Sequence, residues 1–357
     1  MKQQRGFSLM EIIVVLALVS GLMIVVYTLI DETLQTAMFN ESHNDLTIMS
    51  QRAVNQMHVE LLQSSMAFED NTLGNQYRTA LQIPATTPVM PNTLLPVFDT
   101  ATAVNPDTGT GAARRTGNSL LIVRVLAPLE SSADPREHKP VLYDHDNDAA
   151  NPSPTPEIEL PIDRYRFEYF FLSRNAGRSF GGAGYYLDLV RAASDEYVDF
   201  TQLSSLNATQ LRRVTSQLWT YGYRRAWDPG QPVPSAFYDL GRPRITGAFD
   251  PPIANANIPI AKSASILPEM RGGRIAGRME YSVAFRPTAR PPFPIRQPVS
   301  MYAQQNAALP AFPAGFEVKI AGPSGFRRAF VRLVLVSNYR ATNYESQQAT
   351  VTTATRF

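Results

Sequence analysis

The sequence contains no cysteine among its 357 residues. Disulfides, thiolate metal sites and cysteine nucleophiles are therefore excluded. A chain of this length can bury enough core to hold an exported domain without disulfides, so the absence does not exclude export. An excess of charge of one sign is also missing, because 33 Lys and Arg face 31 Asp and Glu. Composition therefore gives no reason to expect a nucleic acid partner.

Motifs of the common hydrolases and nucleotide-binding proteins are missing as well. There is no Walker loop, no HExxH and no G-x-S-x-G. Segment 322–325, which reads GPSG, lacks the spacing of a nucleophile elbow and predicts a turn. The histidines are scattered along the chain, at His43, His58, His138 and His145. We therefore expect a protein that is not an enzyme.

The N-terminal part has no Lys or Arg from Phe7 to Gln51. Within it, Ile12–Ile30 is an uncharged run of 19 residues, and a helix of that length can cross a hydrocarbon core of about 30 Å. Two basic residues precede the run and acidic residues follow it. This charge distribution predicts a cytoplasmic N-terminus, with the rest of the chain on the other side of the membrane.

Glu11 stands at the start of this apolar stretch, next to Leu9 and Met10. A carboxylate at the centre of a membrane helix costs about 2.5–3.5 kcal/mol, and less near an interface, so it marks a functional position with a positive partner. A secretory signal peptide fits poorly, because the run is too long and no small-x-small cleavage site follows it. An ordinary signal anchor has the same orientation but gives no reason for Glu11.

The segment 5–11, RGFSLME, resembles the class III signal of type IV prepilins and type II secretion pseudopilins. This resemblance implies cleavage after Gly6 by a prepilin peptidase and methylation of the new amine of Phe7. It also implies that Glu11 neutralises the N-terminal amine of a neighbouring subunit; pairing two charges in lipid favours docking in one register. Many pilins carry a kinking proline further along this helix, but here the region reads Val26-Tyr27-Thr28-Leu29, which argues against a kink.

Beyond the membrane the sequence predicts that the same helix continues, because residues 7–73 contain no proline and only Gly21 as glycine. Apolar residues recur at helical spacing at Leu34, Met38, Leu46, Met49, Ala53, Met57 and Leu61. The intervening polar positions include Gln35, Asn44, Arg52, Gln56 and Glu60. We expect one helix from about Ser8 to Phe68, about 90 Å long. It suits either a pilin spine or an anchor joined to a stalk or coiled coil.

From residue 73 to 357 the composition changes, and proline-rich segments alternate with candidate strands. The expected strands are Asn118–Ala127, Ile162–Leu172, Ile275–Phe285 and a central strand Phe330–Tyr339. One helix is expected at Ala208–Tyr221, capped by Asn207. The predicted fold is α+β and pilin-like, with a large, mainly antiparallel head. The expected division is a leader at 1–6, helix halves at 7–30 and 31–72, and a head at 73–357.

The apolar segment Phe326–Leu335 resembles the closing strand of PilW-type minor pilins and J-type pseudopilins. Together with the large head, this resemblance implies a minor subunit that primes or caps a type IV pilus. The implied partners are other minor pilins, the major pilin, the prepilin peptidase and the inner-membrane assembly platform. A pseudopilin of a type II secretion system, and a pilus-tip adhesin or DNA-uptake receptor, are the alternatives.

Asp144, Asp146 and Asp148 alternate like the start of a calcium loop, since calcium prefers oxygen ligands. Ala149 and Thr155 stand where an EF-hand requires glycine and glutamate, so a solvated acidic loop is the alternative. No other cofactor is expected. The arginines of segment 271–278 and of the strand at 164–171 could contact DNA, but an exposed turn and a core strand explain them better.

Overall fold

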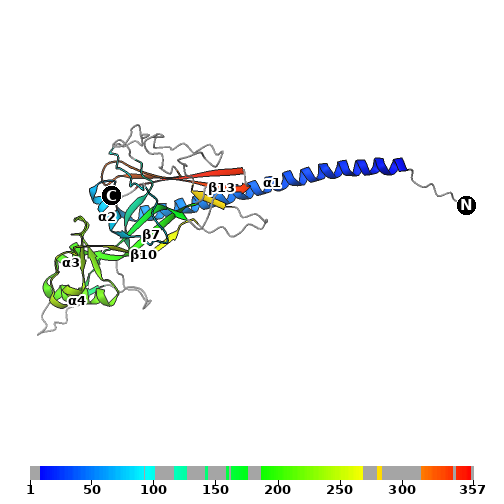
Figure 1. The fold of residues 1–357 in the computed structure, drawn as a ribbon. Helices are drawn as coiled ribbons and strands as arrows, with labels where there is room; N and C mark the ends of the chain where they lie inside the picture. The colour runs from blue at the N-terminus through cyan, green and yellow to red at the C-terminus, as the bar shows by residue number, and fades with distance from the viewer. Residues whose placement is uncertain are drawn as a thin grey trace.

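The computed structural model shows one long helix leading into a head built on two β-sheets, with the start of α1 far from the head (Figure 1). It describes residues 9–91, 93–100, 116–126, 141–143, 158–160, 162–175, 186–267, 280–283, 315–340 and 343–354. Helix α1 (Leu9–Leu62) has 54 residues, which at the standard rise is about 80 Å. It is unbroken through segment 26–29, as expected from the missing proline.

Helix α1 ends at Leu62, earlier than the predicted end near Phe68. The Ser64 hydroxyl donates to the Leu61 carbonyl at 2.6 Å, and the chain then forms strand β1 (Ser64–Ala67). Serine side chains that bond the backbone of the preceding turn compete with helix continuation. Strand β1 therefore follows the end of α1 directly.

The first sheet has the strand order β1-β3-β6-β7-β10-β2, with β8 pairing β7 and β9 pairing β8. Its further strands are β2 (Leu81–Gln82), β3 (Leu120–Leu126), β6 (Arg164–Asn175), β7 (Tyr186–Asp199), β8 (Arg225–Trp227), β9 (Phe237–Asp239) and β10 (Ile258–Ser265). Most pairs are antiparallel, but β2 and β8 run parallel to their neighbours β10 and β7. Strands β3 and β6 confirm the expected strands at 118–127 and 162–172.

The second sheet is centred on β13 (Arg328–Arg340), which confirms the central strand expected there. Its other strands are β11 (Glu280–Val283), β12 (Phe316–Ala321) and β14 (Asn343–Ala354). The turn predicted at 322–325 joins β12 to β13, and Gly322 and Gly325 adopt positive φ values of 117° and 83° there. The segment 326–335 is not the closing strand, because β14 follows it. Only 280–283 of the expected strand at 275–285 lies among the described residues.

The first sheet is buried on both faces, which explains why its central strands are so apolar. One face packs against α1 and the second sheet, through side chains that include Leu120, Ile122, Phe170, Leu189, Phe316 and Val331. The other face carries an aromatic cluster that includes Phe68, Tyr77, Phe167, Tyr169, Trp227 and Phe237. The alternation of residues 164–171 predicted one apolar face, whereas Phe170 and Phe171 on opposite faces are both fully buried.

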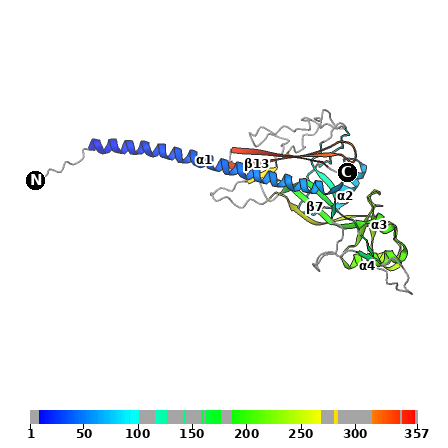
Figure 2. The ribbon, with the colours of Figure 1, turned by 180° about the vertical axis from the view of Figure 1, so that it is seen from behind.

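Residues 200–249 form a distal lobe at the end of the head farthest from the start of α1 (Figure 2). Its helices are α3 (Phe200–Ser204), α4 (Ala208–Thr220) and α5 (Gly241–Thr246), while α2 (Thr72–Ala80) precedes them in the chain. Helix α4 matches the helix expected at 208–221, and Asn207 and Gln210 form a capping box at its start. Strand β4 (Val141–Tyr143) pairs antiparallel with β5 (Ile158–Leu160) and lies against α4.

Candidate functional site: the N-terminal helix and its seat on the head

The first half of α1 is an exposed apolar rod, and every side chain from Leu9 to Ile30 is exposed. An 18-residue window of α1 has a mean hydropathy of 2.8 and no buried residue, which makes α1 long and apolar enough to cross a membrane. The Thr28 hydroxyl in this half donates to the carbonyl oxygens of Ile24 and Val25 at 3.0 and 2.8 Å. The helix thereby satisfies its own polar group, as a lipid environment requires.

The site residues expected from the sequence fall partly on this rod. Glu11 is exposed in the first turn of α1. Gly6 and Phe7 lie outside the described residues, as do Asp144, Asp146 and Asp148. The structure therefore adds a position only for Glu11. Processing at Gly6 and Phe7, assembly through Glu11 and calcium binding by the three aspartates all stay predictions.

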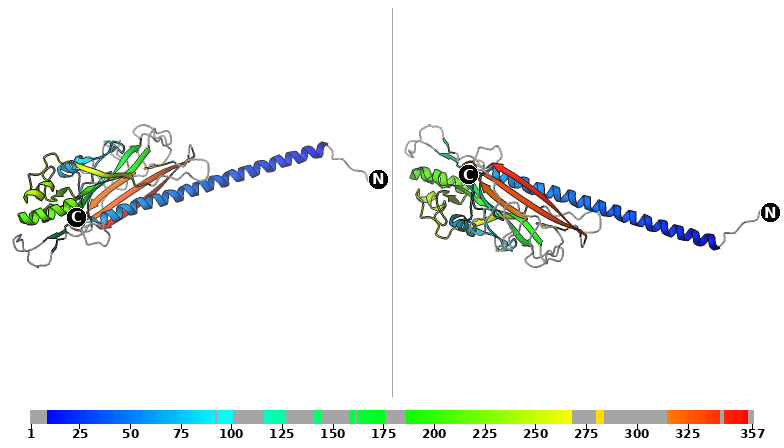
Figure 3. Two further views of the ribbon diagram at one scale, coloured as in Figure 1. Left: turned by 90° about the horizontal axis from the view of Figure 1, so that it is seen from below. Right: turned by 90° about the horizontal axis from the view of Figure 1, so that it is seen from above.

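The second half of α1 packs on the head through the predicted apolar stripe (Figure 3). Five of the seven stripe residues are at most 9% exposed, namely Leu46, Met49, Ala53, Met57 and Leu61. Leu34, by contrast, lies beyond the head and is 48% exposed. The His58 Nδ1 atom lies 2.5 Å from the Thr353 hydroxyl of β14. The helix is thus held by the second sheet as well as by the first.

A buried cluster of two glutamates and two arginines joins the last turns of α1 to three strands of the first sheet. Glu60 of α1 accepts a hydrogen bond from Arg124 of β3 at 2.8 Å and forms an ion pair with Arg191 of β7, also at 2.8 Å. Arg191 also binds Glu168 of β6 through two nitrogens, and the Arg191 Nη2 to Glu168 Oε1 distance is 2.7 Å. Glu168 is fully buried and Glu60 is 5% exposed. The cluster is therefore an internal ionic contact between helix and head.

Burial raises the pKa of Glu60 above its ordinary value of 4.5, and the nearby charge of Glu168 raises it further. Arg191 and Arg124 lower this pKa but do not cancel the effect of burial. The pKa of Arg191 is raised, because Glu168 and Glu60 favour its charged form more than burial disfavours it. The two carboxylates thus compete for the same two guanidinium groups.

Sequence reasoning missed this cluster, since Glu60 was expected among the outward-facing polar positions of the helix. The available signal was a charge inside an otherwise apolar strand. Arg124 interrupts the run LLIVRVL of β3, and Glu168 interrupts the aromatic strand β6. Charged residues are almost never fully buried unless they are paired, so each of these positions predicts a partner of opposite charge.

No group of metal-binding side chains accompanies these features in the part of the chain that the structure describes. No group of three or more His, Cys, Asp or Glu side chains could hold a metal ion there. His43 and His58 lie on α1, and His58 is used in the contact with Thr353. The candidate site in the described residues consists of the exposed apolar half of α1 and the packing of its second half on the head.

Residues 1–27 match a protein-family model described as the prokaryotic N-terminal methylation motif. This match supports the resemblance of the N-terminal segment to the class III prepilin leader of the type IV pilin-like family. Members of this family are structural subunits that share a methylated N-terminus and an apolar helix. No curated protein and no solved structure matches the chain. The match covers the rod and not the head.

Proposed function

We propose that the chain is a minor subunit that primes or caps a type IV pilus. The observation that carries the proposal is the methylation motif at the N-terminal end of an unbroken helix whose first half is exposed and apolar. Water disfavours so long an apolar surface, whereas lipid or neighbouring helices cover it. The subunit is stored in the inner membrane and then drawn into a filament.

The proposed maturation begins with cleavage after Gly6 and methylation of Phe7 by the prepilin peptidase. The N-terminus faces the cytoplasm and the head lies in the periplasm, as the distribution of Lys and Arg favours. Glu11 then pairs with the N-terminal amine of a neighbouring minor or major pilin at the assembly platform. Such pairing offsets the cost of a carboxylate in lipid.

The large head supports a role at the pilus tip, where a bulky subunit does not have to repeat along the filament. The same rod would serve a pseudopilin of a type II secretion system, which remains the first alternative. A tip adhesin or DNA receptor is the second alternative. The calcium loop at Asp144, Asp146 and Asp148 is kept as a separate proposal. Calorimetry of the full chain in detergent tests it, and no heat of calcium binding would reject it.

The test is a deletion of the gene, complemented in separate strains with the wild type, with Glu11→Val or with Glu32→Val. Glu32→Val is the control, because Glu32 is also an exposed acidic residue of α1. Surface pili, secreted exoproteins and DNA uptake are scored in parallel. We expect the deletion and the Glu11→Val strain to lose surface pili, and the Glu32→Val strain to keep them. Normal piliation with lost secretion would overturn the proposal in favour of the pseudopilin.

A further inference from the structure

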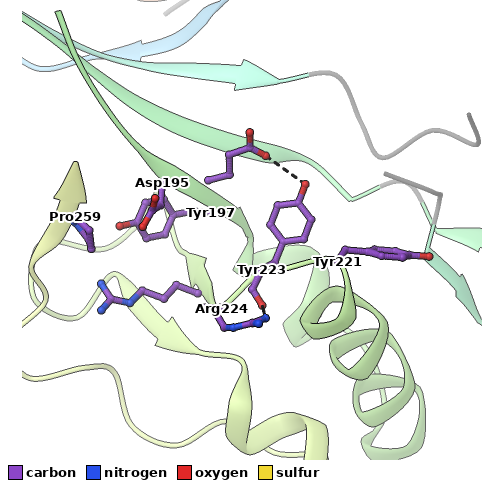
Figure 4. A pocket seen from close by; sticks show the side chains of 9 residues that line it. Asp195, Tyr197, Tyr221, Tyr223, Arg224 and Pro259 are labelled. Carbon is purple, nitrogen blue, oxygen red and sulfur yellow. Dashed lines mark hydrogen bonds between the residues drawn. The ribbon is translucent and has the colours of Figure 1, made fainter. Parts of the chain in front are cut away.

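The outer edge of β10 is paired at its start and open beyond it. On the side away from β7, Ile258 and Pro259 of β10 pair with β2. No strand among the described residues pairs with residues 261–265 on that side. Figure 4 shows Pro259, in the paired part, with Asp195 and Tyr197 of β7 nearby. We call residues 261–265 the β10 edge.

The segment after β2 explains why the β10 edge is open. Pro84 follows two residues after β2 and lacks the N–H of a strand ladder. The chain then turns, and the Thr87 N–H donates to the Pro84 carbonyl at 3.0 Å. The Thr87 hydroxyl lies 2.9 Å from that of Ser263, whose register partner Ala192 belongs to the aromatic cluster. The segment therefore continues across the aromatic face and does not extend the row of β2.

The main-chain groups of the β10 edge alternate in direction. The Ile266 N–H donates to the Leu189 carbonyl of β7 at 2.9 Å, so alternate residues before Ile266 also turn their main chain toward β7. The N–H and C=O groups of Ser263 and Ser265 therefore point away from β7. These four groups have no main-chain partner within the described ranges. Four of the five residues of the edge are exposed, namely Ala261, Lys262, Ala264 and Ser265.

A groove of about 520 Å³ accompanies the β10 edge on the side of α1. It lies between Gln56 of α1 and the strands β7 and β10. Small side chains line it on both strands, among them Ala193 of β7 and Ala264 of β10. A strand added to β10 would turn every second side chain toward this side of the sheet. The small lining residues leave room for them.

Lys262 sets the charge that an added strand would meet. It lines the groove at the open edge, and it has no ion-pair partner in the part of the chain that the structure describes. The other cations of the groove are engaged, since Arg166 donates to Glu196 and Arg191 binds both Glu168 and Glu60. Asp195 lies on β7, which is one strand spacing of about 4.8 Å farther away. A carboxylate on the added strand would therefore have Lys262 as its partner.

A second copy of the chain fits the β10 edge poorly. Segment 258–267, which reads IPIAKSASIL, contains no Asp or Glu. Two such edges paired with each other would bring two lysines together without an acid. Natural sheets use an edge lysine in this way to prevent pairing between copies. The same lysine favours a strand that carries a carboxylate.

We infer that the β10 edge binds an extended segment of another protein that places an Asp or Glu side chain beside Lys262. Its main chain would bond the outward groups of Ser263 and Ser265, as strand addition does. Its carboxylate would pair with Lys262, and alternate side chains would enter the groove. This inference does not rest on the proposed function, because the head presents the same edge in either type of filament.

The test uses the full chain in detergent and the peptide TVEVT, acetylated and amidated at its ends. Saturation-transfer NMR of the peptide and calorimetry both report weak binding. Four main-chain hydrogen bonds correspond to a dissociation constant of about 1 mM. We expect TVKVT to bind at least about threefold more weakly than TVEVT, because it places a like charge beside Lys262. TPEPT should not bind, since its prolines lack the N–H groups that donate to the edge.

Variants of the chain locate the peptide on the β10 edge. Lys262→Glu should reverse the preference, so that TVKVT binds more tightly than TVEVT. Ser263→Pro removes an N–H that points away from β7 and should weaken TVEVT binding at least about fivefold. Ser263→Ala loses the same hydroxyl but keeps the N–H, so it should bind as the wild type does. Arg212→Glu reverses an exposed charge on α4 and is the control.

The inference is overturned if TVEVT does not bind at about 10 mM, well above the expected constant. It is also overturned if Lys262→Glu keeps the preference for TVEVT, or if Ser263→Pro binds TVEVT as the wild type does. A dimer of the full chain that Ser263→Pro abolishes in sedimentation would overturn it too, since a second copy would then occupy the edge. Circular dichroism of each variant shows whether the head has kept its fold.

Discussion

Arg191→Met should destabilise the head more than any substitution of an exposed charge. Arg191 is the residue that serves both carboxylates of the buried cluster. Without it Glu60 keeps Arg124 at 2.8 Å, but Glu168 keeps only a contact with Arg124 at 3.9 Å. Glu168 is fully buried, so water cannot replace the lost donors. Breaking a buried ion pair in this way costs about 3–5 kcal/mol.

The double variant Glu168→Met/Arg191→Met should recover most of that loss. It removes one charge of each sign and leaves Glu60 with Arg124, so no buried charge is left uncompensated. Replacing a buried pair by apolar side chains of similar volume is often neutral. The coupling free energy between the two positions should therefore reach about 2–4 kcal/mol. The upper end of this range exceeds the roughly 0.5–3 kcal/mol that is usual for contacting residues.

The assay is denaturant unfolding of the full chain in detergent, followed by tryptophan fluorescence, because Trp227 is buried in the head. The free energy of unfolding comes from linear extrapolation. Lys262→Met serves as the matched control, since Lys262 is an exposed cation of the neighbouring strand β10. A loss below about 1 kcal/mol for Arg191→Met, or a double variant as unstable as the sum of its singles, would refute the reasoning.

Three further predictions concern the same head. The folded-state pKa of Glu60 lies above 4.5, so the contribution of Glu60 to stability is present at low pH and is lost as the pH rises through the raised pKa. The wild type should therefore lose stability relative to Glu60→Gln as the pH rises through this range. A gain in stability relative to Glu60→Gln would contradict the assignment. Met57→Ala, at a site with 0% exposure, should cost about 2–5 kcal/mol of stability. Val59→Ala, at 49% exposure, should change stability by about 0.5 kcal/mol or less. Equal losses would mean that the helix does not pack on the head as described. Gly247→Ala places a Cβ 2.3 Å from the Ala208 carbonyl oxygen at a φ of 74° and should cost more than Gly222→Ala, which has a positive φ without a clash and should cost about 1–2 kcal/mol; thermal unfolding that ranks the two the other way would reject the described contact.

The sequence was sufficient for features that depend on local periodicity. The apolar run predicts a helix of membrane length by its length and composition. The stripe from Leu46 to Leu61 repeats every three or four residues, so it predicts a helix and its buried face. Asn207 with Gln210 three residues later predicts the start of α4. The unbroken passage through segment 26–29 follows from the absence of proline alone.

Features that depend on what packs against a segment were beyond sequence reasoning. Glu60 looks like a solvated residue until β3, β6 and β7 bring Arg124, Glu168 and Arg191 to it. Strand β14 was missed because its sequence NYESQQATVTTA is mostly polar, and its pairing with β13 supplies the order that its composition does not.

The measurement that tests the central claim most directly is intact-mass and N-terminal peptide analysis of the chain made in a cell with an active prepilin peptidase. A type IV pilin-like subunit should lack residues 1–6 and should begin at Phe7 with one methyl group on its amine. Gly6→Val should block both changes while leaving the head folded. A wild-type chain that still begins at Met1 with an unmethylated Phe7 would contradict the account.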